Sequence, residues 1–369
     1  MPFTPGFNLE EAKQLMSLCA AMEEPTPPLD PPPFPANWTI IFDSGDLEPF
    51  DNRWQLVANK EIPNRYAIVI RGTVNTFKSI LADLLAVMVR ANGSVDFKQD
   101  GKEYSLTYQM AETGNDRAGV HLGFTIATLI LMYHPESGIL SKLMDLPANS
   151  EIFVAGHSQG AAIATLCRSL LNYPANFSCF LDSSHFQYKT YLFAQPRPGN
   201  DFFANDFDMI SSSNGMAFKV NNNRDWIPQV PITFESPWDA NEPNPLSVLA
   251  SKGVFRLILT IIHKIVLFVH KKAHVRKHMR KADYLKHFFK HEKFQQMVCT
   301  GEKSKPVKPE DLNIVFPDIL GTLNFVNCGS PYILKGVSWT NPDNPDDSFW
   351  QHHPAMYYYL LAGKPVPKK

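Results

Sequence analysis

A serine held between two glycines is the strongest chemical signal in the chain. Residues 156–160 read Gly-His-Ser-Gln-Gly, which places Ser158 between a run of buried-strand character and a run of small helix-forming residues. Glycines at these two positions permit a sharp strand-to-helix turn that lifts the hydroxyl above the sheet and sets it at the positive end of the helix dipole. The chemistry that this predicts is nucleophilic attack, with Ser158 as the nucleophile.

An unassisted hydroxyl is a poor nucleophile, so Ser158 needs a base and a carboxylate that orients the base. Asp225 follows a predicted strand at the edge where α/β sheets carry functional groups, and it is the preferred acid. His352 and His353 precede an apolar C-terminal helix, and periodicity does not separate them as the base. Three other carboxylates lie in a predicted helix start and are the rival acids: Asp201, Asp206 and Asp208.

Strands that alternate with helices must position these groups. The predicted strands, dense in Ile, Val, Phe and Tyr, are 38–44, 66–73, 151–158, 189–196 and 217–225. The predicted helices between them are 77–90, 118–133 and 160–173. Several strands are apolar at consecutive positions, as strands buried on both faces should be. The pattern predicts an α/β fold with a mostly parallel central sheet and helices on both faces.

The N-terminal region differs in composition from the rest. Residues 9–22 predict a helix, and residues 25–35 contain seven prolines in eleven positions, which excludes helix and central strand there. We therefore predict an N-terminal helix with a proline-rich strap over 1–36 and one α/β domain over 37–369.

Composition excludes several classes of protein. The 35 basic and 36 acidic residues leave a net charge of −1, which argues against a dedicated nucleic-acid binder. Five scattered cysteines do not form a disulfide framework and mildly favour a reducing compartment. The N-terminus lacks the pattern of a secretory signal, and no run of 18 apolar residues predicts a spanning helix. The expected location is cytoplasmic or peripheral to a membrane.

Five further motifs occur in a recognisable order around the serine turn. Together with that turn they resemble the class 3 lipases, whose members include the fungal triacylglycerol lipases. The resemblance covers roughly residues 40–235 and the last twenty or so. The motifs are Tyr66–Thr73 (ending R-G-T), Asp83–Leu84, Gly119–Phe124 (V-H-x-G-F), Phe193–Asn200 (F-x-x-P-R-x-G-N) and Val220–Pro231 (V-x-N-x-x-D-x-x-P-x-x-P).

The resemblance implies an α/β-hydrolase fold with Ser158 as nucleophile, Asp225 as orienting acid and a C-terminal histidine as base. In the family an aromatic residue follows the base at short range, and Tyr357 in that role favours His352 over His353.

The resemblance also implies an oxyanion hole formed by the backbone N–H of Gln159 and by Thr73. By the same comparison, Arg197 is expected to be a structural ion-pair residue and His121 a satisfied core histidine. The implied reaction requires no metal and no organic cofactor.

One segment departs from the compact members of the family. An insertion at about 247–302 contains 12 Lys or Arg and two acidic residues between Lys252 and Lys293. Its apolar first half and basic second half suit a helix at an anionic membrane or lipid interface, a lid, or a solvated helix on the body. In the family the lid follows the R-G-T strand, so residues 77–92 predict a second lid-like helix. Which of the two elements moves stays open.

We therefore predict a serine hydrolase that cleaves carboxylic esters of lipids through an acyl-enzyme, as a triacylglycerol lipase does. The alternatives are a phospholipase A1 or short-chain carboxylesterase with the same residues, and an inactive membrane-binding module. The expected partners are a lipid ester substrate and, through residues 252–294, an anionic membrane or lipid interface. No nucleic acid is expected.

Overall fold

The computed structural model describes residues 3–72, 87–99, 102–173, 177, 181–235, 239, 261, 264–265, 284–285, 288 and 319–368. Most of the lid-like helix predicted at 77–92 and most of the insertion predicted at 247–302 lie outside the described residues. Where residues 77–92 are described, the helix prediction is wrong, because residues 88–90 form a strand and Asn92 begins another.

A seven-stranded sheet forms the centre of the molecule, in the order β1-β2-β3-β8-β9-β10-β11. The neighbours from β3 to β11 run parallel, and β1 and β2 are antiparallel additions at one edge. The predicted fold class is confirmed, although β2 and β11 were not predicted. The strands are β1 (Trp38–Asp43), β2 (Arg53–Asn59), β3 (Arg65–Arg71), β8 (Glu151–His157), β9 (Gln187–Phe193), β10 (Ala217–Asn222) and β11 (Ser330–Leu334).

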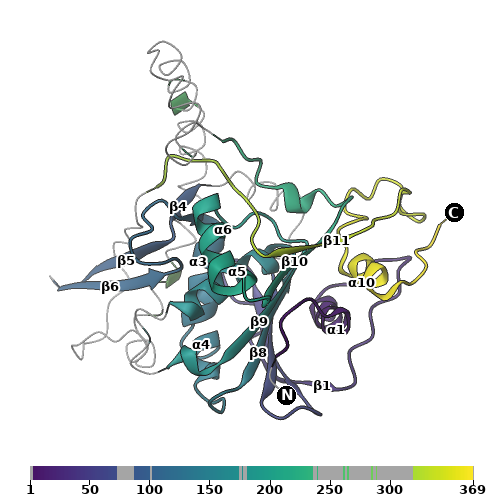
Figure 1. Cartoon of the computed structure of the whole chain (residues 1–369), viewed down its shortest axis with the longest axis horizontal. Helices are drawn as coiled ribbons and strands as arrows, with labels where there is room; N and C mark the ends of the chain where they lie inside the picture. Colours follow the sequence, from purple (N-terminus) through teal and green to yellow (C-terminus); the bar gives the residue numbers. More distant parts are fainter. Residues whose placement is uncertain are drawn as a thin grey trace.

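Helices cover both faces of this sheet (Figure 1). Successive side chains of a strand point to opposite faces, and β8 follows this rule. Ile152 and Val154 belong to the core on the side of α3 (Leu122–Tyr133) and α5 (Gln159–Asn172). Phe153 and Ala155 belong to the core on the side of α1 (Leu9–Ala20) and α10 (Pro354–Ala362).

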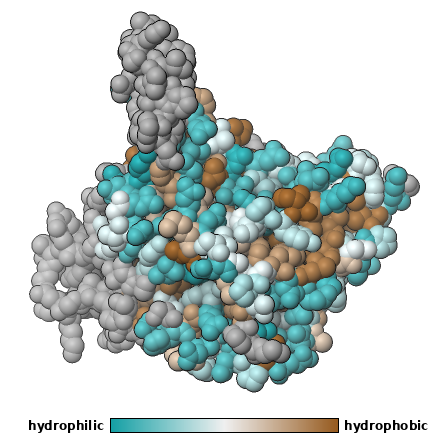
Figure 2. Space-filling view, in the orientation of Figure 1, coloured by the Kyte–Doolittle hydropathy of each residue, from teal (hydrophilic) through white to brown (hydrophobic). Residues whose placement is uncertain are grey.

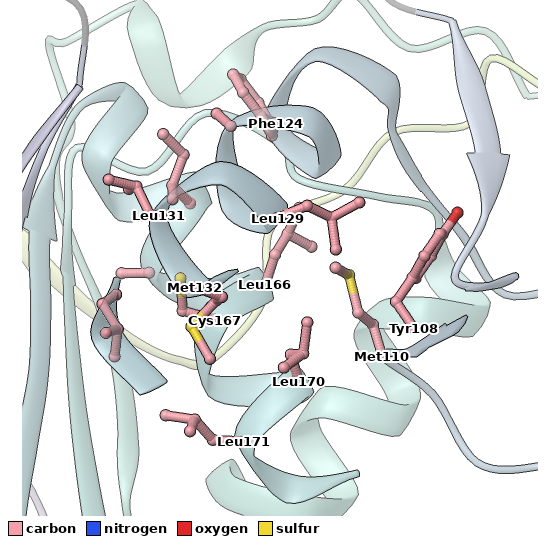
Figure 3. Close-up of a cluster of buried hydrophobic side chains, with 14 of the residues drawn as sticks. Tyr108, Met110, Phe124, Leu129, Leu131, Met132, Leu166, Cys167, Leu170 and Leu171 are labelled. Carbon is pink, nitrogen blue, oxygen red and sulfur yellow. The ribbon is translucent and has the colours of Figure 1, made fainter. Parts of the chain in front are cut away.

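The larger of the two cores lies between α3, α5 and the sheet. Every residue of α3 is buried, so this helix is enclosed by protein on all sides. Figure 3 shows Leu129 and Met132 of α3 among Leu166, Cys167 and Leu170 of α5, with Tyr108 and Met110 beside them. This packing buries α5 between α3 and the sheet.

Smaller elements surround the sheet. The predicted helix at 118–133 is wrong in its first residues, because Gly119–His121 form a strand before α3 begins. That strand, β7, pairs with β4 (Met88–Arg90), while β5 (Asn92–Gln99) pairs with β6 (Lys102–Gln109). The remaining segments are α4 (Ile139–Leu143), α6 (Asp201–Phe207), a π-helical turn (Asp208–Ser212) and 3₁₀ turns at Ser183–His185 and Ile227–Gln229.

The proline-rich strap contains neither helix nor strand, as predicted, and it packs against the C-terminal region. Leu29 is buried in a cluster with Trp350, Met356 and Tyr359. The Tyr359 hydroxyl accepts a hydrogen bond from the Asp30 backbone N–H at 3.1 Å. The strap therefore connects the start of the chain to α10.

A few residues of the basic insertion are described. Leu285 and Phe288 are buried in the main core, and the Phe288 ring lies 5.2 Å from that of His134. Ile261 and Ile265, four residues apart, are exposed. Across the part of the chain that the structure describes, no helix is long and apolar enough to cross a membrane.

Candidate active site

The serine turn joins β8 to α5 directly. Ser158 has φ 56° and ψ −132°, a strained conformation for a residue with a side chain. Both flanking glycines are required by close contacts. A Cβ on Gly160 would lie 2.2 Å from the Ile70 carbonyl oxygen, and one on Gly156 would lie 2.4 Å from the carbonyl of Gly160. The turn is therefore built as the glycine pattern predicted.

The end of β3 approaches the first turn of α5. A Cβ on Gly72 would lie 2.6 Å from Cβ of Gln159, so the two segments are in direct contact. Gln159 begins α5, so its N–H lies in the first turn of that helix. Thr73, the other predicted oxyanion residue, lies outside the described residues.

Ser158, His352 and Asp225 are connected by hydrogen bonds, although they come from distant parts of the chain. His352 Nε2 lies 2.8 Å from Ser158 Oγ, and His352 Nδ1 lies 2.7 Å from Asp225 Oδ2. The consistent proton assignment has Nδ1–H donating to the carboxylate and Nε2 accepting from the serine hydroxyl. In this arrangement His352 is able to take the serine proton.

His353, the alternative base, is directed elsewhere. Its Nε2 lies 2.9 Å from Asp347 Oδ2, within the loop that precedes α10. Burial lowers the pKa of His353 below its ordinary value, more than the neighbouring Asp347 raises it. The structure therefore brings His352, and not His353, to Ser158.

Asp225 is held by three donors. It follows β10, its Oδ1 accepts from the Ile227 N–H at 3.0 Å, and its Oδ2 accepts from the Tyr357 hydroxyl at 2.8 Å as well as from His352. Burial, followed by the Asp225 charge, raises the pKa of Tyr357 well above its ordinary value, so the phenol remains a donor. Asp225 and His352 are 3% and 6% exposed. Ser158 is half-buried.

Side chains around these residues fix the loop that carries the histidine. Asn222, at the end of β10, donates to the Gln351 carbonyl at 2.8 Å, and its own N–H donates to the Tyr357 hydroxyl at 3.0 Å. The role of Tyr357 as a donor to Asp225 was not predicted. The signal in the sequence was only its distance from the two histidines.

Two other residues singled out in the sequence, His121 and Arg197, have structural roles. His121 is buried, and its Nδ1 accepts from the Gly123 and Phe124 N–H groups at the start of α3, as expected for a core histidine. Arg197 donates to the Pro231 carbonyl at 3.0 Å, and among the described residues it forms no ion pair, so that expectation is wrong. Within the same residues, no three His, Cys, Asp or Glu side chains gather as metal ligands do.

The parallel sheet, the helices on both faces and the serine turn between β8 and α5 define an α/β-hydrolase. Residues 67–235 match the family model "Lipase (class 3)". Over these residues the chain is similar to the class 3 lipases, and the resemblance predicted from the motifs is confirmed.

Curated relatives match over shorter segments. A secreted mono- and diacylglycerol lipase of Fusarium solani is 28% identical over 113 residues, which is 31% of this chain and 30% of the relative. One of Malassezia restricta is 38% identical over 82 residues, 22% of this chain and 24% of the relative. The chain thus spans less than a third of the length of the relatives it matches. Among solved structures, Rhizomucor miehei triacylglyceride lipase is 22% identical with a TM-score of 0.43, covering 62% of this chain and 77% of that one.

Proposed function

We propose that the protein is a serine hydrolase that cleaves carboxylic esters of lipids, in the manner of a triacylglycerol lipase. The observation that carries the proposal is the continuous hydrogen-bonded path from Ser158 through His352 to Asp225, with both bonds shorter than 3 Å. A buried carboxylate behind the histidine and a strained serine turn in front of it are features that activate a nucleophile.

In the proposed reaction, Ser158 Oγ attacks the ester carbonyl while His352 Nε2 takes its proton. Asp225 stabilises the imidazolium that forms, and His352 then gives the proton to the leaving alcohol. A water molecule, deprotonated by the same nitrogen, hydrolyses the acyl-enzyme and releases the fatty acid. The backbone N–H of Gln159 and Thr73 would bind the oxyanion, and the contact between Gly72 and Gln159 supports that assignment.

Apolar groups near the site support a lipid as the substrate. The rings of Trp226 and Phe349 are 5.4 Å apart, and Phe349 lies 6.0 Å from the His352 ring. Farther along the segment that follows Asp225, Ile232 is 83% exposed and Phe234 41%. In Figure 2 an apolar area lies on the side of the molecule where Figure 1 places β11 and α10. The relatives that match this chain are named as lipases of acylglycerols.

Peripheral contact with an anionic membrane or lipid interface through residues 252–294 is part of the proposal. Ile261 and Ile265 support it, because two exposed isoleucines one helical turn apart present an apolar edge to the surroundings.

Hydrolysis of p-nitrophenyl esters from acetate to palmitate, with and without anionic liposomes, tests the proposal. We expect activity in the wild type and its loss, by a factor on the order of 10⁴ or more, in Ser158→Ala and His352→Ala. An optimum at long chains would favour a lipase and one at acetate or butyrate a short-chain esterase. Greater activity on liposomes would support the interfacial contact.

His353→Ala is the matched control, since it removes the neighbouring imidazole and leaves the Ser158–His352 contact in place. We expect it to retain most of the activity. Equal losses in the two histidine variants would contradict the assignment of His352. A wild type that binds liposomes but hydrolyses no ester would replace the hydrolase with a membrane-binding module.

A further inference from the structure

His157, the residue immediately before the candidate nucleophile, faces away from Ser158 and contacts the backbone of the candidate base. Because side chains alternate along β8, His157 shares a face with Phe153 and Ala155, toward α1 and α10. Its Nε2 lies 2.8 Å from the His352 carbonyl oxygen, across 195 positions of sequence. Its ring lies 4.8 Å from that of His352 and 5.6 Å from that of Tyr357.

This contact defines the tautomer of His157. A carbonyl oxygen only accepts hydrogen bonds, so Nε2 of His157 must carry the proton. The other nitrogen, Nδ1, is buried and has no hydrogen-bond partner among the described residues. Burial, and then the nearby His352, lower the pKa of His157 well below its ordinary value. His157 is therefore a neutral donor beside the ring that must become cationic during the proposed reaction.

The carbonyl of His352 depends on this donor. It belongs to the residue before the N-cap of α10, so it lies outside the hydrogen-bonded turns of that helix. The ring of His352 is already engaged on both nitrogens, by Asp225 and Ser158. The contact from His157 adds a third attachment point, on the main chain of His352. It therefore determines where the His352 ring lies between Asp225 and Ser158.

We propose that His157 is a positioning residue for the proposed reaction. It fixes the backbone of His352, so that His352 Nε2 stays within hydrogen-bonding distance of Ser158 Oγ. Adjacent residues of one turn then hold both partners of the Ser158–His352 contact, the nucleophile directly and the base through its carbonyl. The contact from His157 thereby keeps the distance between Ser158 Oγ and His352 Nε2 constant when α10 or the loop before it moves. The inference rests on the proposed function for its kinetic consequence.

Two variants at this position separate positioning from simple packing. His157→Leu fills much of the same buried volume without a donor, while His157→Gln retains an N–H at a similar distance from Cα. We measure acylation of Ser158 in single turnovers of p-nitrophenyl butyrate and by labelling with an organophosphonate, well below the melting temperature of each variant. A misplaced base typically costs on the order of 10²-fold in rate.

For His157→Leu we expect kcat about 10- to 100-fold lower with KM changed less than about twofold, and for His157→Gln activity within about threefold of the wild type. A lower melting temperature with unchanged kcat in His157→Leu would overturn the proposal, since it would show a purely structural role. Failure of glutamine to restore the rate lost with leucine would also overturn it.

A readout independent of turnover separates this proposal from the proposed function. The proton shared by His352 Nδ1 and Asp225 should give a low-field resonance in the wild type and in His157→Gln, and a broadened or missing one in His157→Leu. If the wild type hydrolyses no ester but this pattern holds, the proposed function fails while the positioning role stands. An unchanged resonance in His157→Leu would remove the structural basis of the inference.

Discussion

At the scale of single residues, the site concentrates backbone strain. Ser158 and Ala194 both have positive φ, at 56° and 51°, and neither is glycine. They are adjacent in space, since the Ser158 N–H donates to the carbonyl of Phe193 at 3.0 Å. Such conformations cost about 1–2 kcal/mol each for residues with a Cβ. The strain at Ser158 has a chemical reason, because it presents the hydroxyl, whereas Ala194 holds its conformation without a reacting group.

Ala194→Gly should therefore stabilise the protein. Glycine removes the steric cost of the left-handed conformation and adds a smaller entropic cost in the unfolded chain, for a net gain of about 0.5–1 kcal/mol. Urea denaturation measures the change. Ala155→Gly in β8 is the control, because Ala155 is equally buried, lacks positive φ and should lose stability. Destabilisation by Ala194→Gly would show that its methyl packing outweighs the strain.

At the scale of elements, the strap is a structural support for the C-terminal helix. Leu29 is 3% exposed and packs on Trp350, Met356 and Tyr359, two of which lie within α10. The loop that carries His352 leads directly into α10. Packing of Leu29 on the outer side of α10 therefore supports the segment that positions His352.

Leu29→Ala should cost about 2–3 kcal/mol of unfolding free energy, from lost burial and the cavity that remains. Amide hydrogen exchange should accelerate across 354–362, since the helix loses part of its cover. Phe34→Ala provides the comparison, because Phe34 is 39% exposed in the same strap and should change stability by less than about 1 kcal/mol. Similar losses in both variants would mean that the strap contributes as a whole and not through Leu29.

Elements also differ in how far sequence alone predicts them. The serine turn is encoded by a five-residue pattern in which Gly156 and Gly160 were visible, although the group that Gly160 must approach is the carbonyl of Ile70 on β3. The contact of Tyr357 with Asp225 spans 132 positions, and that of His157 with His352 spans 195. Contacts of this range depend on how α10 packs on the sheet, which no local pattern encodes. The short strand β11 has few alternating residues and was missed for the same reason.

At the scale of the whole molecule, helices on both faces of the sheet bury its central strands, such as β8. The same packing buries titratable groups. His157 and His353 both have lowered pKa values, with burial as the main cause in each case. Glu23 shows the opposite effect, a pKa raised by burial and partly offset by Arg71 and His352. The burial that creates the core thus makes stability depend on pH.

The two buried histidines predict a loss of stability on mild acidification. In the unfolded chain a histidine binds a proton below a pH of about 6.5, while the lowered pKa values of His157 and His353 leave these rings less protonated in the folded protein at the same pH. The unfolded state then binds more protons, so stability falls as pH decreases below about 6.5, by up to about 1.4 kcal/mol per pH unit for each group that stays neutral. The loss attributable to each histidine ends once the pH has passed below its folded pKa. Glu23 acts in the opposite direction, so single variants isolate the histidines.

Urea denaturation between pH 5 and 8 should show that the free energy of unfolding falls less on acidification in His157→Gln and His353→Gln than in the wild type. The difference should be larger for His157, whose pKa is lowered further. Parallel stability curves for all three proteins would show that these rings do not remain neutral in the fold.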